Sequence, residues 1–254
     1  MIIVKLGGSV ITKKATPLTI NREAIAQLAT TLKESRVPLI IVHGAGSFGH
    51  YNAGRFGLDS GEETRNPEGI ARTRDSVLHL NLSLTKILQE SGLNIYSFPP
   101  IALYREGKLE THANKVITEI MKINLIPLTY GDVMLGENGF RIMSGDVIVR
   151  DLAILLKPER IVFASDVDGI SEKPGKKSPI LRELDRGMIH KLSFSKVRND
   201  VTGGMESKVL EAMRIAGQGI DVFFTNGLRR DRLMKALKGE KDGGTVIRGF
   251  NYEN

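Results

Sequence analysis

The chain of 254 residues contains no cysteine, which excludes disulfide bonds and thiolate metal sites. Aromatic residues make up only 6% of the sequence. No apolar run approaches the ~18 residues that a membrane-spanning helix needs. The opening apolar run, residues 1–4, is too short for a secretory signal and has no cleavage pattern after it. Together these absences predict a cytoplasmic protein without a membrane partner.

The basic residues are scattered, although the formal net charge is +7. A nucleic-acid-binding protein would be expected to gather its basic residues in one stripe and to interleave them with aromatic side chains. The one dense basic stretch, residues 173–177, contains proline and glycine and is predicted to be a solvated loop. We therefore expect no nucleic-acid partner, and a basic surface that attracts small polyanions such as nucleotides.

Apolar runs alternate with segments of helical periodicity along the whole chain. The predicted strands are residues 2–6, 39–42, 94–98, 125–130, 160–165 and 221–225, with a closing edge strand at 244–247. The predicted helices are residues 22–34, 67–90, 114–124, 147–156, 205–217 and 229–237. Two hairpins are predicted between them, at residues 101–110 and around the turn 136–139. This alternation predicts an α/β fold, a mostly parallel sheet with helices on both faces.

Three details of these elements carry expectations of their own. Asn21 is a plausible N-cap of the first long helix, and either Ser144 or Asp146 could cap the helix at 147–156. The apolar face of helix 67–90, with Val77 and Leu80, is expected to be core or a subunit contact. Part of that face could instead line a pocket for an apolar substrate tail.

The segment from His43 to His50 reads His-Gly-Ala-Gly-Ser-Phe-Gly-His and follows a predicted buried strand. Its glycines allow backbone N–H groups to converge on an anion, and a helix starting near Gly46 would add its dipole. The spacing matches neither the dinucleotide-binding fingerprint nor the P-loop. A tight strand-to-helix turn would explain the glycines alone. His50, a titratable donor at the far end, favours an anion-binding function.

Two lysines accompany further glycine-rich segments. Lys5 ends a strand and is followed by Gly7, Gly8 and Ser9, a pairing of ammonium and bare backbone that suits a polyphosphate. Lys208 lies about one turn into a helix that opens on the glycine-rich stretch 200–205. Each lysine could also be an ordinary surface cation beside a turn.

Acidic residues stand beside two of these loops. Asp146 follows Ser144 and Gly145, where it could cap a helix or orient two lysines around a phosphate. Asp166 directly follows a predicted strand, where ligands bind in open α/β sheets. The pattern from Asp166 to Gly169 alone could also be a turn or a pair of metal ligands.

These motifs, in this order, resemble the amino-acid kinase superfamily over the full chain. The motifs are Lys5 to Ser9, His43 to Gly46, Ser144 to Asp146, Ser165 to Gly169 and Asp200 to Lys208. Within the superfamily, His50 and the segment 10–14 are similar to the isopentenyl phosphate kinase family. The main alternative within the superfamily is the fosfomycin kinases. Ala45 stands where these loops often have a glycine, and its methyl group is tolerable only if the φ angle of Ala45 is negative.

The resemblance implies an enzyme that transfers the γ-phosphoryl group of ATP to isopentenyl phosphate, giving isopentenyl diphosphate for isoprenoid synthesis. It implies catalytic roles for Lys5, Lys14, His50, Asp146 and Lys208. It places ATP on Lys5, Gly7, Gly8, Ser9, Gly46, Asp166, Gly203 and Lys208. It places the acceptor on Ala45, Gly46, Gly49, His50 and Gly145. Lys13 is an alternative to Lys14 as the functional loop lysine.

The same resemblance implies a three-layer αβα sandwich formed by a single domain, residues 1–254. An acceptor-binding lobe would cover about residues 1–158 and an ATP-binding lobe about 159–254. Magnesium would be carried on the ATP phosphates, with no metal site made by the protein, and the enzyme would be a homodimer. A regulatory nucleotide-binding module of the same fold would lack the catalytic cations, and their presence here favours an enzyme.

Overall fold

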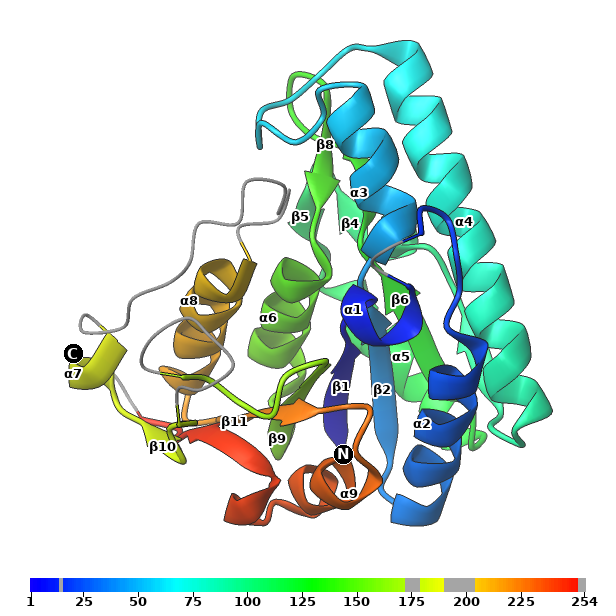
Figure 1. The fold of residues 1–254 in the computed structure, drawn as a ribbon. Helices are drawn as coiled ribbons and strands as arrows, with labels where there is room; N and C mark the ends of the chain where they lie inside the picture. The colour runs from blue at the N-terminus through cyan, green and yellow to red at the C-terminus, as the bar shows by residue number, and fades with distance from the viewer. Residues whose placement is uncertain (14–15, 172–178, 190–203, 251–254) are drawn as a thin grey trace.

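The computed structural model describes residues 1–13, 16–171, 179–189 and 204–250 (Figure 1). Lys14, Gly203, most of the stretch 200–205 and the basic stretch 173–177 lie outside these ranges. No helix in the described ranges is both long enough and apolar enough to cross a bilayer.

The described residues form a central sheet of eight strands in the order β10-β12-β11-β9-β1-β2-β6-β3. The strands are β1 Ile2–Leu6, β2 Leu39–His43, β3 Ile95–Ser97, β6 Ile126–Tyr130, β9 Arg160–Ser165, β10 Glu183–Leu184, β11 Asp221–Asn226 and β12 Gly244–Ile247. All neighbours pair in parallel except β11 and β12, which are antiparallel. The predicted mostly parallel sheet is confirmed.

The predicted edge position of residues 244–247 is wrong. β12 pairs with β11 on one side and with β10 on the other, so the short strand β10 forms that edge of the sheet. β10 has only two residues and carries no apolar run, which is why the sequence pattern gave no indication of it.

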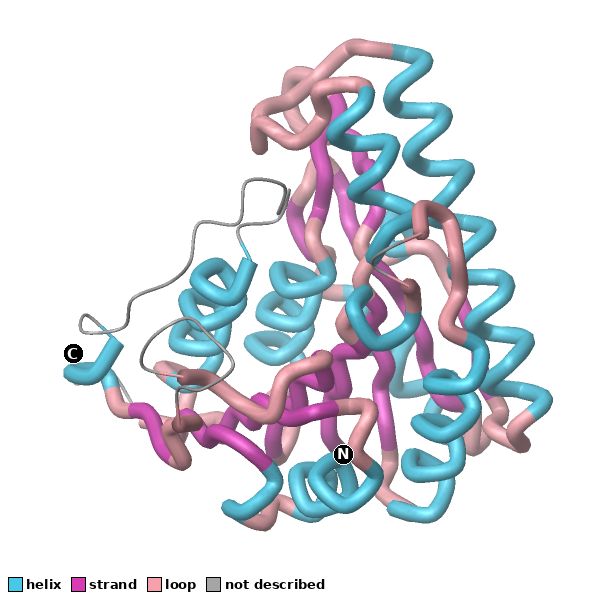
Figure 2. The backbone as a smooth tube through the Cα atoms, in the orientation of Figure 1, coloured by secondary structure: helices cyan, strands magenta, loops and turns pink. Residues whose placement is uncertain are grey.

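Helices cover both faces of the sheet (Figure 2). One face packs against α2 Arg22–Ser35, α4 Pro67–Glu90 and α9 Arg230–Lys238. The other packs against α5 His112–Lys122, α6 Gly145–Leu156 and α8 Gly204–Ala216. Alternate β1 residues serve the two cores: Val4 faces the first and Ile3 the second. The predicted three-layer sandwich is thereby confirmed.

Shorter elements complete the chain. They are α1 Gly8–Ile11, α3 Gly46–Arg55, η1 Pro100–Ala102, α7 Arg186–Ile189 and η2 Lys241–Gly243. Both predicted hairpins form, one from β4 Tyr104–Arg105 and β5 Lys108–Leu109, the other from β7 Asp132–Leu135 and β8 Phe140–Met143. The first strand of the earlier hairpin is shorter than predicted, because Pro100 begins a 3₁₀ turn that extends through Ala102.

Local contacts decide the expectations about capping and about the α4 face. The Ser144 hydroxyl accepts a hydrogen bond from Val147 N (3.2 Å), so Ser144 is the cap of α6 and Asp146 is available for another role. Asn21 is the N-cap residue of α2, as predicted, and its carbonyl oxygen accepts from Ile25 N (3.1 Å), but its side chain makes no capping hydrogen bond. Val77 and Leu80 are buried in the core, as the first alternative predicted.

Candidate active site

The glycine-rich loops meet at one edge of the sheet because β1, β2 and β9 are parallel neighbours. Leu6 at the end of β1 aligns with His43 of β2 and with Ala164 of β9. The ladder continues past the strand ends, since Gly44 N donates to Leu6 O (2.9 Å) and Gly7 N donates to Ala164 O (2.8 Å). The segments that follow β1, β2 and β9 therefore lie side by side, although they are far apart in the sequence. Ligands bind at this end of the strands in open α/β sheets.

Lys5, Asp146 and Lys208 form the charged centre of this edge. The Lys5 ammonium donates to Asp146 Oδ1 at 2.6 Å, and the Lys208 ammonium lies 3.8 Å from Oδ2 of the same carboxylate. The carboxylate and Lys5 are almost fully buried, whereas the Lys208 side chain is 20% exposed. One carboxylate thus places two cations from opposite ends of the sequence at one point.

The ionisation of Asp146 follows from these contacts. Burial alone raises the pKa of this carboxyl, but the charges of Lys5 and Lys208 and the Lys5 hydrogen bond outweigh it, so the pKa of Asp146 is lowered. Asp146 is therefore an anion at neutral pH. Its negative charge holds the two ammonium groups at one point.

The start of α1, directly after β1, lies against the start of α3. A Cβ on Gly8 would come within 2.3 Å of Gly46 Cα, so neither position leaves room for a side chain between the two backbones. Thr12 links them from the side: its hydroxyl donates to Gly8 O (2.8 Å) and accepts from Ser47 N (3.1 Å). The sequence pattern placed Thr12 near the loop without assigning it this contact.

The start of α3 has the backbone that the sequence requires. The φ angle of Ala45 is −74°, so it is negative, as a residue with a methyl side chain requires. The residue in the left-handed conformation is Gly46, with φ +52°. His50 lies one turn further along α3 and is partly buried. Gly49 is buried against Ala45. The four predicted acceptor-site residues of this segment thus lie close together, at the N-cap and in the first five residues of α3.

Gly145 joins the same edge from α6. A Cβ there would lie 3.1 Å from His43 O and 3.5 Å from Lys5 Cε, so the first turn of α6 packs against both β1 and β2. Ser9 lies in the short helix α1 that follows β1, and the partly exposed Asp166 lies on the loop that follows β9. Among the predicted residues, Lys14 and Gly203 lie outside the described ranges.

A buried polar cluster beneath the α3 loop was not predicted. The ring of His43 is fully buried and stacks on Tyr130, with centroids 5.1 Å apart. Its Nδ1 lies 3.0 Å from Gly44 O and its Nε2 lies 3.2 Å from the side-chain amide of Asn81. Burial lowers the pKa of His43 to about 4, against the effect of these two hydrogen bonds, and the Lys5 charge lowers it further. His43 is therefore a neutral support of the loop.

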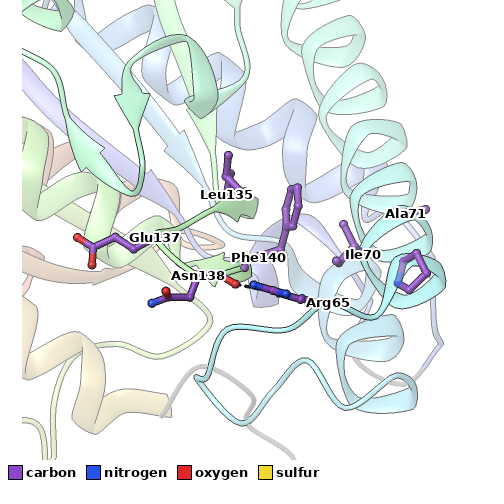
Figure 3. Close-up of a pocket in the computed structure, with 9 residues that line it drawn as sticks. Arg65, Ile70, Ala71, Leu135, Glu137, Asn138 and Phe140 are labelled. Carbon is purple, nitrogen blue, oxygen red and sulfur yellow. Dashed lines mark hydrogen bonds between the residues drawn. The ribbon is translucent and has the colours of Figure 1, made fainter.

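A separate pocket of about 660 Å³ lies between the first turns of α4 and the β7–β8 hairpin. Figure 3 shows its mainly apolar lining, including Leu135, Phe140 and Ile70, with Arg65 at the side, where its Nε donates to Asn138 O (3.1 Å). None of the residues that line it is a predicted site residue. The charged centre described above is therefore not part of this pocket.

The fold and the charged centre define a class of protein. A sequence model described as the Amino acid kinase family matches residues 1–226, which include every predicted site residue. Phosphoryl-transfer sites rely on cations and backbone N–H groups held in place rather than on covalent chemistry, and this edge of the sheet has both.

The individual relatives narrow the class. Isopentenyl phosphate kinase from Methanothermobacter thermautotrophicus is 35% identical, over 98% of this chain and 99% of that protein. Isopentenyl phosphate kinase from Thermoplasma acidophilum is 34% identical, over 98% of this chain and 100% of that protein. A solved structure of isopentenyl phosphate kinase superposes with a TM-score of 0.80 at 30% identity, covering 97% of this chain and 100% of the other. The chain belongs to the isopentenyl phosphate kinase family.

Proposed function

We propose that the protein transfers the γ-phosphoryl group of ATP to isopentenyl phosphate, which gives isopentenyl diphosphate and ADP. The observation that carries the proposal is the Asp146 carboxylate, which pairs with the ammonium groups of both Lys5 and Lys208 next to Gly145, where an added Cβ would lie 3.5 Å from Lys5 Cε. Two fixed cations at that position suit the β- and γ-phosphates and the charge that develops between donor and acceptor.

The acceptor phosphate would lie at the start of α3, on the backbone of Ala45 and Gly46, with His50 as a side-chain donor. A phosphate monoester is already ionised at neutral pH, so the transfer needs no general base. This agrees with a histidine, rather than a carboxylate, at this position. Gly49 and Gly145 would contribute through packing, since Gly49 leaves room for the Ala45 methyl group and Gly145 lets α6 approach His43 and Lys5.

The nucleotide would occupy the loops that follow β1 and β9. Gly7, Gly8 and Ser9 would contact phosphate oxygens, and Asp166, Gly203 and Lys208 would lie on the ATP side. The predicted loop lysine, Lys14, would reach the transferring group. Magnesium neutralises the phosphates when it is bound. The donor set fits an ion that arrives on the nucleotide, because Asp146 already shares both of its oxygens with lysines.

Apolar side chains lie along α3 beyond the proposed acceptor-phosphate site. Ala53, one turn beyond Gly49 on α3, packs with Leu58 and Val133 in a small cluster that Ile70, Phe140 and Ile142 extend. A prenyl chain attached to a phosphate at the start of α3 would meet these side chains.

We propose in addition a homodimer and a cytoplasmic location, where ATP is available. Leu78 and Leu82 on α4 and Tyr96 on β3 are exposed apolar side chains, and β3 is an edge strand of the sheet. A second copy could cover them. The division into an acceptor lobe and an ATP lobe near residue 158 would place Asp146 and Lys208 on opposite sides of the boundary.

A coupled assay of ADP formation tests the function. We expect turnover with isopentenyl phosphate that exceeds turnover with fosfomycin, uridylate or acetylglutamate at equal concentration, and ³¹P NMR should identify a diphosphate product. Turnover with fosfomycin instead of isopentenyl phosphate would overturn the assignment in favour of the alternative acceptor. Light scattering on the same preparation measures whether the protein is a dimer.

A further inference from the structure

A second ionic contact joins α6 to α8 one helical turn beyond the charged centre. Arg150 follows Asp146 by four positions on α6, and Glu211 follows Lys208 by three positions on α8. Side chains at these spacings lie on the same face of a helix. Arg150 Nη1 donates to Glu211 Oε2 at 2.9 Å. The two helices are therefore linked twice, through Asp146–Lys208 and through Arg150–Glu211.

The second contact is the more tightly held of the two. The Glu211 side chain is 8% exposed and that of Arg150 is 23% exposed. Asp151 Oδ1 accepts from both Nε and Nη2 of Arg150, at 2.9 and 2.6 Å. Tyr104 donates to the other oxygen of Asp151 at 3.1 Å. Each of the three guanidinium nitrogens thus donates a hydrogen bond. An ion pair with this geometry can fix the position of one helix relative to the other.

The contact between Lys208 and Asp146 is looser. It spans 3.8 Å, against 2.6 Å for Lys5, and the Lys208 side chain has a flexible four-carbon stem. The reach of its ammonium toward Asp146 depends on how closely α8 packs on α6. The partly buried Arg150–Glu211 contact and the apolar packing of α6 on α8 join the same two helices.

We propose that Arg150 and Glu211 are positioning residues, which hold α8 against α6 so that the Lys208 ammonium meets the phosphates. This inference rests on the proposed role of Lys208 in phosphoryl transfer. Neither residue needs to touch a substrate, because each acts through the helix that carries a member of the charged centre. A misplacement of about 1 Å at such a centre costs up to ~10²-fold in rate.

The test is a double-mutant cycle with Glu211→Gln and Lys208→Met. Glu211→Gln keeps the shape of the side chain and removes its charge. In the wild-type background we expect it to lower kcat by about tenfold or more, with the KM for the acceptor nearly unchanged. In the Lys208→Met background the same substitution should change kcat by less than about twofold, because there is no ammonium left to position. The loss of thermal stability should be equal in both backgrounds.

Arg214→Met is the matched control. Arg214 Nη1 donates to the other oxygen of Glu211 at 2.6 Å but its side chain is 59% exposed and does not reach α6. We expect wild-type kcat from this variant. If Glu211→Gln does not fold, Arg150→Lys, which keeps a cation, replaces it in the same cycle.

Equal loss of kcat from Glu211→Gln in both backgrounds would overturn the proposal, as would wild-type kcat in the folded single variant. The affinity for ATP, measured by calorimetry without an acceptor, tests the positioning of Lys208 independently of which acceptor the enzyme phosphorylates. The affinity for ATP should be weaker in Glu211→Gln than in the wild type. Adding Glu211→Gln to Lys208→Met should not weaken it further, whichever acceptor the enzyme uses.

Discussion

The methyl group of Ala45 fills the space that a side chain at Gly49 would need. A Cβ at position 49 would lie 2.3 Å from Ala45 Cβ, far inside van der Waals contact. The two residues face each other across the first turn of α3, where Gly49 N also donates to Ala45 O (3.1 Å). An alanine at one of these positions therefore requires a glycine at the other.

The first prediction is that Gly49→Ala destabilises the protein by about 1–3 kcal/mol, as overpacking does in a well-packed interior. The double variant Ala45→Gly/Gly49→Ala moves the methyl group to the other side of the contact and should recover most of that loss. Chemical denaturation measures both free energies of unfolding.

Gly54→Ala is the control for this pair. Gly54 lies on the same helix, and the nearest heavy atom to its added Cβ is 3.9 Å away, so the substitution should not reduce stability. If the double variant is as unstable as Gly49→Ala alone, the steric relation between Ala45 and Gly49 is not the cause of the loss.

The second prediction concerns the two ammonium groups. Lys5→Met and Lys208→Met keep an unbranched stem and remove the charge, and each should lower kcat by ~10²-fold or more if the ammonium stabilises the transferring phosphoryl group. Lys5→Met should also lower stability, because it leaves the buried Asp146 with the more distant cation alone. Steady-state kinetics and thermal melting separate these effects.

Turnover at the wild-type rate in a folded Lys208→Met protein would contradict the assignment of this centre. Lys86→Met is a suitable comparison, since Lys86 lies on α4 away from the glycine-rich loops.

The sequence predicted the sheet and the charged centre because both depend on local signals. Each strand that was predicted is a short apolar run, and Lys5, Asp146 and Lys208 each lie beside glycines at a strand end or a helix start. The rule that parallel strands open on one edge then places the loops together. The pairing of Lys5 with Asp146, 141 positions apart, follows from topology once the fold is known.

The parts that escaped the sequence analysis depend on partners that are far away in the chain. β12 is interior because β10 pairs with it, and two residues of strand make no detectable pattern. Arg150 and Glu211 look like ordinary helix-surface charges until α6 and α8 are packed together. Arg150 and Glu211 share a helix face with Asp146 and Lys208, and this spacing is visible in the sequence. It indicates a contact between the two residues only when α6 and α8 are known to be neighbours.

The third prediction is a pH dependence of stability caused by His43. Its pKa is lowered from 6.5 to about 4 by burial, so the unfolded chain binds a proton more readily than the native protein between these values. The free energy of unfolding should therefore fall by about 3 kcal/mol as the pH drops from about 6.5 to about 4. Denaturant titrations at half-unit pH steps measure the slope.

His43→Asn removes the titrating ring, and this part of the slope should disappear although the variant is less stable at neutral pH. The same slope in wild type and variant would assign the pH dependence to other groups. His79→Asn, at an exposed position of α4, controls for the general effect of losing a histidine.

The last prediction separates two functions of His50. If His50 donates to the acceptor phosphate, a charge-assisted hydrogen bond of ~1.5–3 kcal/mol is lost in His50→Ala. That corresponds to roughly one to two decades in kcat/KM for isopentenyl phosphate, with ATP affinity and Tm nearly unchanged. His50→Gln keeps a donor without the charge and should recover part of the loss. A structural histidine would instead lower Tm and affect ATP and acceptor alike. Acceptor kinetics, ATP calorimetry and melting on one preparation of His50→Ala distinguish the two, and intact acceptor kinetics would remove His50 from the acceptor site.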